Sequence, residues 1–142
     1  MMANDPIRAV FRLDPDLVLL GVLRCAVQHQ ALQAGLGSDI CAEFAKASED
    51  VCRETLSQLT EEGKVLEVTL DTFHDRIEIS IHHHGQMVPA VGLEAFAFSE
   101  SAADGPGRLN GLELLSRVDR VLFSAEEGVA RTTLVKYLHQ KR

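Results

Sequence analysis

The stretch Ile77-Glu78-Ile79-Ser80-Ile81-His82-His83-His84-Gly85 is the most regularly alternating part of this sequence. Its three isoleucines recur at every second residue, so they share one face of a predicted strand, and His83 has the same parity. His82 and His84 point to the opposite face. Gly85 predicts the end of the strand, because glycine permits a sharp turn or a close approach to the backbone. A polar residue of buried parity at a strand end, here His83, is typical of a ligand site.

The composition is that of an ordinary globular domain, with 142 residues of which 46% are hydrophobic and 25% are charged. The net charge of −7 argues against nucleic acid or an anionic membrane as the main partner, because such binding needs clustered lysine and arginine. No apolar run has the length of a signal peptide or of a bilayer span, so we expect a cytoplasmic protein. A protein partner or a small ligand is the better expectation.

The three cysteines, Cys25, Cys41 and Cys52, lie within apolar helical patterns. They are odd in number and lack the close paired spacing of a zinc knuckle. We therefore interpret all three as small core residues in a reducing compartment.

The other patterns predict a single α+β domain over residues 1–142, with a core at about 9–139. We expect a strand at 9–13, helices at 15–33 and 38–59, strands at 65–73 and 77–85, a helix at 109–118, and strands at 120–124 and 129–138. Asp14 is the expected N-cap of the first helix. Residues 86–108 lack periodicity beyond a turn of helix at 93–98, and a loop of this length predicts a mobile lid. The sum is a two-layer α/β sandwich, with helices on one face of a mostly antiparallel, mixed sheet.

The first helix is apolar around more than one narrow stripe. One face contains Leu17, Leu20, Leu23, Val27 and Ala31, and Leu19 and Val22 lie beside it. The second apolar surface is either a homodimer interface or an extension of the core.

Three pieces of the chain carry a resemblance to a known family. They are the hairpin that ends at Gly85, the helix around Glu49, and Gly111-Leu112-Glu113-Leu114-Leu115-Ser116-Arg117-Val118-Asp119-Arg120-Val121-Leu122-Phe123. Together they resemble the GHKL-type (Bergerat-fold, histidine-kinase-like) ATPase domain, in particular the anti-sigma factor serine kinases, over about residues 9 to 139. The resemblance implies a Bergerat sandwich, a homodimer through the first helix, ATP with Mg²⁺, and phosphorylation of a protein antagonist.

The same resemblance assigns roles to individual residues. Glu49 matches the catalytic general base, which would orient a water or a protein hydroxyl toward the terminal phosphate. Arg53 stands where the family has a metal-binding asparagine, and a guanidinium has no lone pair for Mg²⁺. His83 stands where an aspartate would accept the adenine amino group, and Gly85 keeps the first glycine of that motif while Met87 replaces the next. The remaining cofactor-binding matches are Gly107, Arg108, Asn110 and Gly111 around the phosphates and Thr132 in the closing strand.

Other interpretations of these residues stay open. Glu49 could instead form an ordinary helical ion pair with Arg53 at i,i+4. His82 and His84 share a strand face, as in a Zn²⁺ or Ni²⁺ site, although two histidines without a third ligand make a weak site. The glycine-rich segment around Gly107 and Arg108 could be a loop without a ligand.

Because the nucleotide motifs are degenerate, the leading expectation is a regulatory protein similar to anti-sigma factors. It would bind a sigma factor or an anti-sigma antagonist in transcription regulation, with ATP binding and serine kinase activity weakened or lost. The first alternative is an active ATP-dependent serine/threonine-protein kinase of such an antagonist. The second is a pseudo-enzyme adaptor in two-component signal transduction, and the third is a metal sensor that uses His82 and His84.

Overall fold

The computed structural model describes residues 5–14, 16–58, 65–84, 111–126 and 128–138, with the backbone alone at 58, 83–84, 111–113 and 126. The elements are β1 (Ile7–Leu13), α1 (Leu17–Gln33), α2 (Ser38–Gln58), β2 (Leu66–Thr72), β3 (Arg76–His84), α4 (Gly111–Arg117), β4 (Arg120–Glu126) and β5 (Val129–Tyr137). Each predicted helix and strand is confirmed, with boundaries that differ by at most two residues. The predicted lid at 86–108, with its turn of helix at 93–98, lies outside the described residues.

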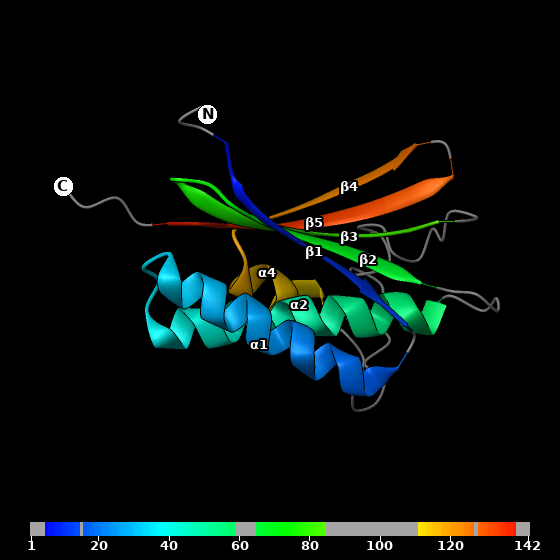
Figure 1. Cartoon of the computed structure of the whole chain (residues 1–142), viewed down its shortest axis with the longest axis horizontal. Helices are drawn as coiled ribbons and strands as arrows, with labels where there is room; N and C mark the ends of the chain where they lie inside the picture. Colours follow the sequence, from blue (N-terminus) through cyan, green and yellow to red (C-terminus); the bar gives the residue numbers. More distant parts are fainter. Residues whose placement is uncertain (1–4, 15, 59–64, 85–110, 127, 139–142) are drawn as a thin grey trace.

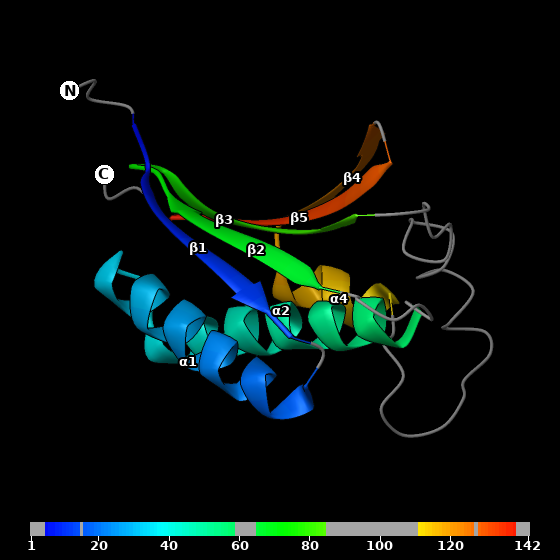
Figure 2. The same cartoon turned by 45° about the vertical axis from the view of Figure 1, so that its right-hand side comes forward.

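The strands form one five-stranded sheet in the order β1-β2-β3-β5-β4, and every pairing among the described strands is antiparallel. The expectation of a mixed sheet was therefore wrong. The two hairpins, β2–β3 and β4–β5, are antiparallel because their connections are short. The long connection through α4 brings β5 beside β3 in the antiparallel sense as well. All three described helices lie on one face of the sheet, as predicted (Figures 1 and 2).

The alternation in β3 sets the face that the helices cover. Ile77, Ile79 and Ile81 are at most 1% exposed. In the register, Ile79 lies between Leu70 of β2 and Leu134 of β5. These side chains join those of α1 and α2 in one hydrophobic core. The period of two therefore places one side of the sheet in the core and leaves the other side, the open face, away from the helices.

Helix α1 begins and ends at residues whose chemistry explains the boundary. Asp16, rather than the predicted Asp14, is the N-cap, and its carboxylate accepts a hydrogen bond from the backbone N–H of Val18 at 3.0 Å. At the other end Gly35 has a φ of 104°, which favours glycine, and the Leu36 N–H donates to the Ala31 carbonyl at 3.2 Å. The chain turns there, and a connection of four residues, 34–37, separates α1 from α2.

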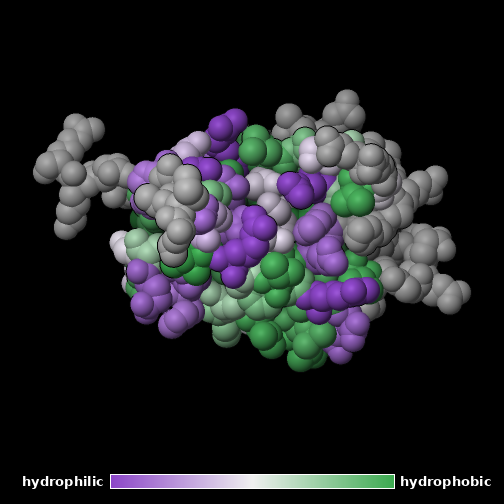
Figure 3. All heavy atoms as spheres, turned by 45° about the horizontal axis from the view of Figure 1, so that its top comes forward, coloured by the Kyte–Doolittle hydropathy of each residue, from purple (hydrophilic) through white to green (hydrophobic). Residues whose placement is uncertain are grey.

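The apolar surface of α1 is divided between the core and the outside. Leu20, Leu23, Val27 and Ala31 are fully buried, as predicted, whereas Leu17 is 59% exposed. The first turn of α1, which contains Leu17, lies farthest from the sheet in both views (Figures 1 and 2). Leu17, Val18, Val22 and Leu32 are between 51% and 77% exposed and form what we call the α1 patch. Hydrophobic side chains gather over this helix in Figure 3.

Two of the cysteines are core residues and one is not. Cys41 and Cys52 of α2 are fully buried, whereas Cys25 is exposed on α1, so the expectation of three core cysteines was wrong for Cys25. Position 25 lies outside the 20, 23, 27 and 31 series that faces the sheet. Separately, none of the helices within the described ranges is both long enough and apolar enough to cross a membrane.

Candidate functional site

Glu49 lies on α2, at the border between the buried and the exposed face of that helix. Its neighbours Ser48, Val51 and Cys52 are at most 1% exposed and pack toward the core. Ser48 Oγ donates to the Phe44 carbonyl at 2.9 Å, which satisfies this buried hydroxyl within the helix. The amphipathic pattern thus presents Glu49 at the side of the helix layer, where it is 8% exposed.

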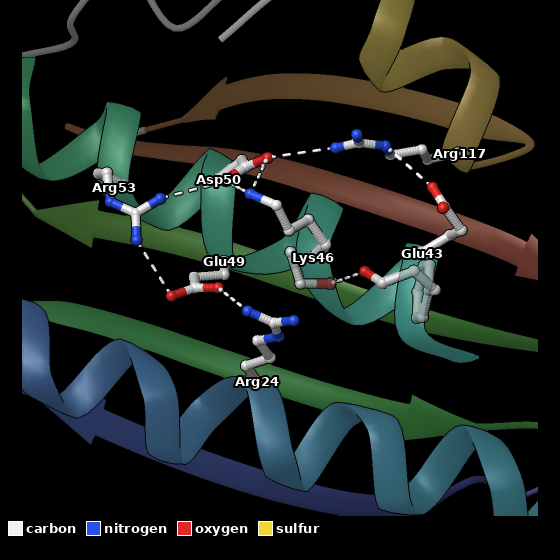
Figure 4. Close-up of polar contacts among 9 residues, drawn as sticks. Arg24, Glu43, Lys46, Glu49, Asp50, Arg53 and Arg117 are labelled. Carbon is white, nitrogen blue, oxygen red and sulfur yellow. Dashed lines mark hydrogen bonds and ion pairs between the residues drawn. The ribbon is translucent and has the colours of Figure 1, made fainter. Parts of the chain in front are cut away.

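Both carboxylate oxygens of Glu49 accept hydrogen bonds from arginines. Arg53, one turn later on α2, donates to Oε2 at 3.0 Å, and Arg24 of α1 donates to Oε1 at 3.2 Å. Figure 4 shows the Glu49 carboxylate between these two guanidiniums, on the side of α2 that faces α1. The predicted i,i+4 ion pair is therefore present, and a contact between helices is added to it.

Asp50 extends the same cluster toward α4. Its carboxylate accepts from Lys46 at 3.1 Å, from Arg53 at 3.1 Å and from Arg117 at 3.3 Å. Arg117 also forms an ion pair with Glu43 at 3.0 Å (Figure 4). The α2 charge cluster, as we call it, consists of Arg24, Glu43, Lys46, Glu49, Asp50, Arg53 and Arg117, and it ties α1, α2 and α4 together.

This arrangement limits what Glu49 can do chemically. A general base must accept a hydrogen bond from the group that it deprotonates, and each Glu49 oxygen already accepts one from a guanidinium, so that group would have to share the carboxylate with Arg24 and Arg53. Arg53 carries a positive charge and donors only, so it offers no ligand to Mg²⁺. The described residues at this position can hold an anion or neutralise a carboxylate, but they do not make a divalent cation site.

The other predicted site residues are only partly described. Gly111 is the first residue of α4, and Thr132 is 2% exposed on the helix-facing side of β5, between Ile81 and Phe123 in the register. The backbone of His83 in β3 pairs with that of Ala130 in β5. The side chain of His83 is not among the described parts of the structure. Gly85, Gly107, Arg108 and Asn110 lie outside the described residues altogether. Of the predicted site residues whose side chains the structure describes, only Arg53 contacts Glu49.

The described part of the sheet gives no support to a metal site at His82 and His84. His82 Nδ1 lies 3.9 Å from Glu67 Oε1, across the β2–β3 pairing. The His84 side chain is not described. Within the described residues, no group of three histidine, cysteine or acidic side chains is arranged to hold a metal ion.

A shallow pocket of about 140 Å³ lies beside the α2 charge cluster. It is lined by Asp39, Ile40, Glu43, Ser116, Arg117 and Lys136. Its cations already have partners, because Arg117 contacts Glu43 and Asp50 while Lys136 lies 3.5 Å from Asp119. The pocket therefore presents balanced charges rather than a site for one charged ligand.

Reasoning from the sequence missed Arg24, Lys46, Asp50 and Arg117. The 46–50 spacing is a local signal, because a lysine and an aspartate four residues apart on a helix lie on the same face. Arg24 and Arg117 give no comparable signal, since they are 25 and 67 residues from their partners Glu49 and Asp50. Compared with known proteins, the sequence matches no family model and no curated protein.

Replacing Glu49 with alanine is expected to lower the free energy of unfolding by about 1–2 kcal/mol, measured by urea denaturation. The loss leaves Arg24 and Arg53 without this partner. Their side chains are 43% and 38% exposed, so solvent screening keeps the cost below that of breaking a fully buried pair. Glu43→Ala is the matched control with a 59% exposed carboxylate, and it should cost about 0.5 kcal/mol or less. Equal losses in the two variants would contradict a special role for Glu49.

Proposed function

We propose that this chain is a regulatory protein similar to anti-sigma factors, built on a Bergerat-type sandwich, which acts by binding a protein and has lost phosphoryl transfer. The observation that carries the proposal is the pairing of both Glu49 oxygens with Arg24 and Arg53. The expected catalytic base is thus part of an ion-pair cluster that joins two helices. The proposed partner is a sigma factor or an anti-sigma antagonist.

The architecture supports the fold part of the proposal. A five-stranded antiparallel sheet carries α1, α2 and α4 on one face, and α4 starts at Gly111, as the resemblance implies. The helix that contains Glu49 precedes the β2–β3 hairpin, and α4 precedes the β4–β5 hairpin. This is the order of elements on which the resemblance to the GHKL-type domain rests.

The chemistry of the α2 charge cluster supports the loss of kinase activity. Phosphoryl transfer from ATP depends on a divalent cation that bridges the phosphates and is held by oxygen ligands. At the position of the metal-binding asparagine, Arg53 instead donates to Glu49 and Asp50. A cation there would meet a guanidinium that already neutralises the nearest carboxylates.

The α1 patch supports action through protein binding. Leu17, Val18, Val22 and Leu32 leave exposed apolar side chains along one helix, which favours a contact with another protein surface. In the proposal, the α1 patch is the interface of a homodimer, and the two chains together bind the partner.

We expect isothermal titration with ATP and ADP to give no Mg²⁺-dependent heat at concentrations that detect a Kd of about 1 mM. Wild-type protein is titrated with and without Mg²⁺, and unfolding temperatures are recorded in parallel. In gel filtration, the chain should form a complex with a sigma factor or an anti-sigma antagonist from the same organism.

Two outcomes would overturn the proposal. Mg²⁺-dependent ATP binding that is lost in Glu49→Ala would make the chain an active serine kinase. Complex formation with a response-regulator receiver or a histidine kinase, but not with the sigma factor or antagonist, would make it an adaptor in two-component signalling.

A further inference from the structure

The open face of the sheet, which none of the described helices α1, α2 and α4 covers, has an ordered pattern of charge. In the strand register, side chains of one parity fall into three rows that cross all five strands. The first row is Arg12, Glu67, His82, Arg131 and Ser124; the middle row is Val10, Thr69, Ser80, Thr133 and Leu122; the third row is Arg8, Asp71, Glu78, Val135 and Arg120.

The middle row consists of short side chains. Ser80 Oγ and Thr133 Oγ1 are hydrogen-bonded to each other at 3.0 Å, and Thr133 is only 7% exposed. Val10 and Leu122 at the two ends are 63% and 42% exposed. The row thus forms a low floor, with hydroxyls at its centre and an exposed apolar side chain at each edge strand.

The two outer rows contain the long charged side chains, and their carboxylates already have partners. Asp71 is bonded to Arg8 at 2.7 and 3.0 Å. Glu78 accepts from Arg76 at 2.6 Å, and Glu67 lies 3.9 Å from His82. Asp71 and Glu78 are therefore neutralised by arginines within the sheet face itself.

Three arginines on this face remain available. No hydrogen bond or ion pair joins Arg12, Arg120 or Arg131 to another residue in the part of the chain that the structure describes, and all three are exposed. They occupy β1, β4 and β5, so they surround the floor on both sides and at both edges. Although the chain has a net charge of −7, the charged side chains of the open face that have no partner among the described residues are positive. Strongly hydrophilic residues are spread over this layer in Figure 3.

The spacing of the rows suits a helix lying across the strands. Residues 8 and 12 are four positions apart on β1, which separates the outer rows by about 13 Å. An α-helix with its side chains is about 10–12 Å wide. Five strands span about 19 Å, which equals the length of about 13 helical residues. In Figure 2, β4 and β5 curl away from the helices at one end, whereas β1 and β2 run toward the helix layer, so the sheet is twisted.

We propose that the open face is the docking surface for an acidic amphipathic helix of the partner protein. Carboxylates along both flanks of that helix would meet Arg12 and Arg131 on one side and Arg120 on the other. Small apolar residues of the helix would lie on the Thr69-Ser80-Thr133 floor, between Val10 and Leu122. The inference rests on the proposed function, because it assigns the surface by which the chain binds a protein.

The test uses a fluorescein-labelled, stapled helical peptide of about 16 residues, with glutamates on both flanks and alanine and leucine between them. Fluorescence anisotropy at low salt should give saturable binding, and the same peptide with glutamines should not saturate. The double variant Arg12→Gln, Arg131→Gln is expected to weaken binding by about tenfold or more. The double variant Gln28→Glu, Gln33→Glu on α1 lowers the net charge by the same two units and should bind within about twofold of wild type.

The docking surface and the proposed function can be overturned by different results. Equal affinity in the arginine variant and the α1 control, or no saturable binding of the acidic peptide, would overturn the docking assignment. Circular dichroism checks that both variants are folded, which is expected because all four substituted residues lie at the surface. Mg²⁺-dependent ATP binding would overturn the proposed function while leaving a positive peptide result intact.

Discussion

Replacing Phe44 with alanine is expected to lower the free energy of unfolding by about 3–5 kcal/mol. Phe44 is fully buried on α2 and heads the largest fully buried side chains of the described core. It belongs to the cluster that joins α1 and α2 to β2, β3 and β5, so its removal leaves a cavity between the two layers. The layers cannot close around that cavity without moving α2, because strands of the sheet hold the opposite wall.

Urea denaturation followed by far-ultraviolet circular dichroism measures this loss. Phe44→Leu, which keeps most of the volume, should cost about 1–1.5 kcal/mol. Val18→Ala is the control on α1, because Val18 is 77% exposed, and it should change the stability by about 0.5 kcal/mol or less. A cost for Phe44→Ala as small as that of Val18→Ala would mean that α2 does not pack on the sheet in this way.

The fold was predictable from local signals because its elements are strongly patterned. The alternation at 77–81 and the helical period from Phe44 to Val51 and Thr55 define buried faces without knowledge of the partner element. It was harder to predict from the sequence that every strand pairing is antiparallel. Strand order depends on how β3 and β5 meet across a long connection, and no local pattern contains that information.

The candidate site was predictable only where it is local. The Glu49–Arg53 contact follows from a spacing of four on one helix. The second oxygen of Glu49 is bound by Arg24, and Asp50 is bound by Arg117, which is 67 residues away in the sequence. Pairing of this kind depends on how the helices pack. It also changes the interpretation of Glu49 from an available base to a neutralised carboxylate.

The charge pattern of the open face also could not be predicted from the sequence alone. Arg12, Arg120 and Arg131 are scattered along an acidic sequence and suggest no basic patch when counted along the chain. Only the register of five strands brings them around one floor of short side chains. An overall net charge excludes a partner class only when the charges are evenly distributed over the surface.

Raising the pH from about 8 to about 10.5 is expected to destabilise the protein by about 2 kcal/mol through Cys52 alone. Burial raises the pKa of this thiol from 9.0 to about 12, and the nearby negative charge of Glu49 adds to the rise while Arg53 opposes it. In the unfolded chain the thiol ionises from about pH 9, whereas the folded protein keeps it protonated. The stabilising contribution is therefore complete below about pH 9 and is lost progressively between pH 9 and 12, by up to about 1.4 kcal/mol per pH unit.

The comparison with Cys52→Ala isolates this effect, because the two proteins share every other ionisable group. At about pH 8 the variant should be less stable than wild type, since alanine leaves a small cavity in a fully buried position. At about pH 10.5 the difference should shrink or reverse, because the variant has no buried thiol that the unfolded chain can ionise. Cys25→Ser is the control, since an exposed thiol meets water in both the folded and the unfolded chain. An equal loss of stability in wild type and Cys52→Ala over this pH range would show that Cys52 is not sealed between α2 and the sheet, and the packing of the helix that carries Glu49 would have to be revised.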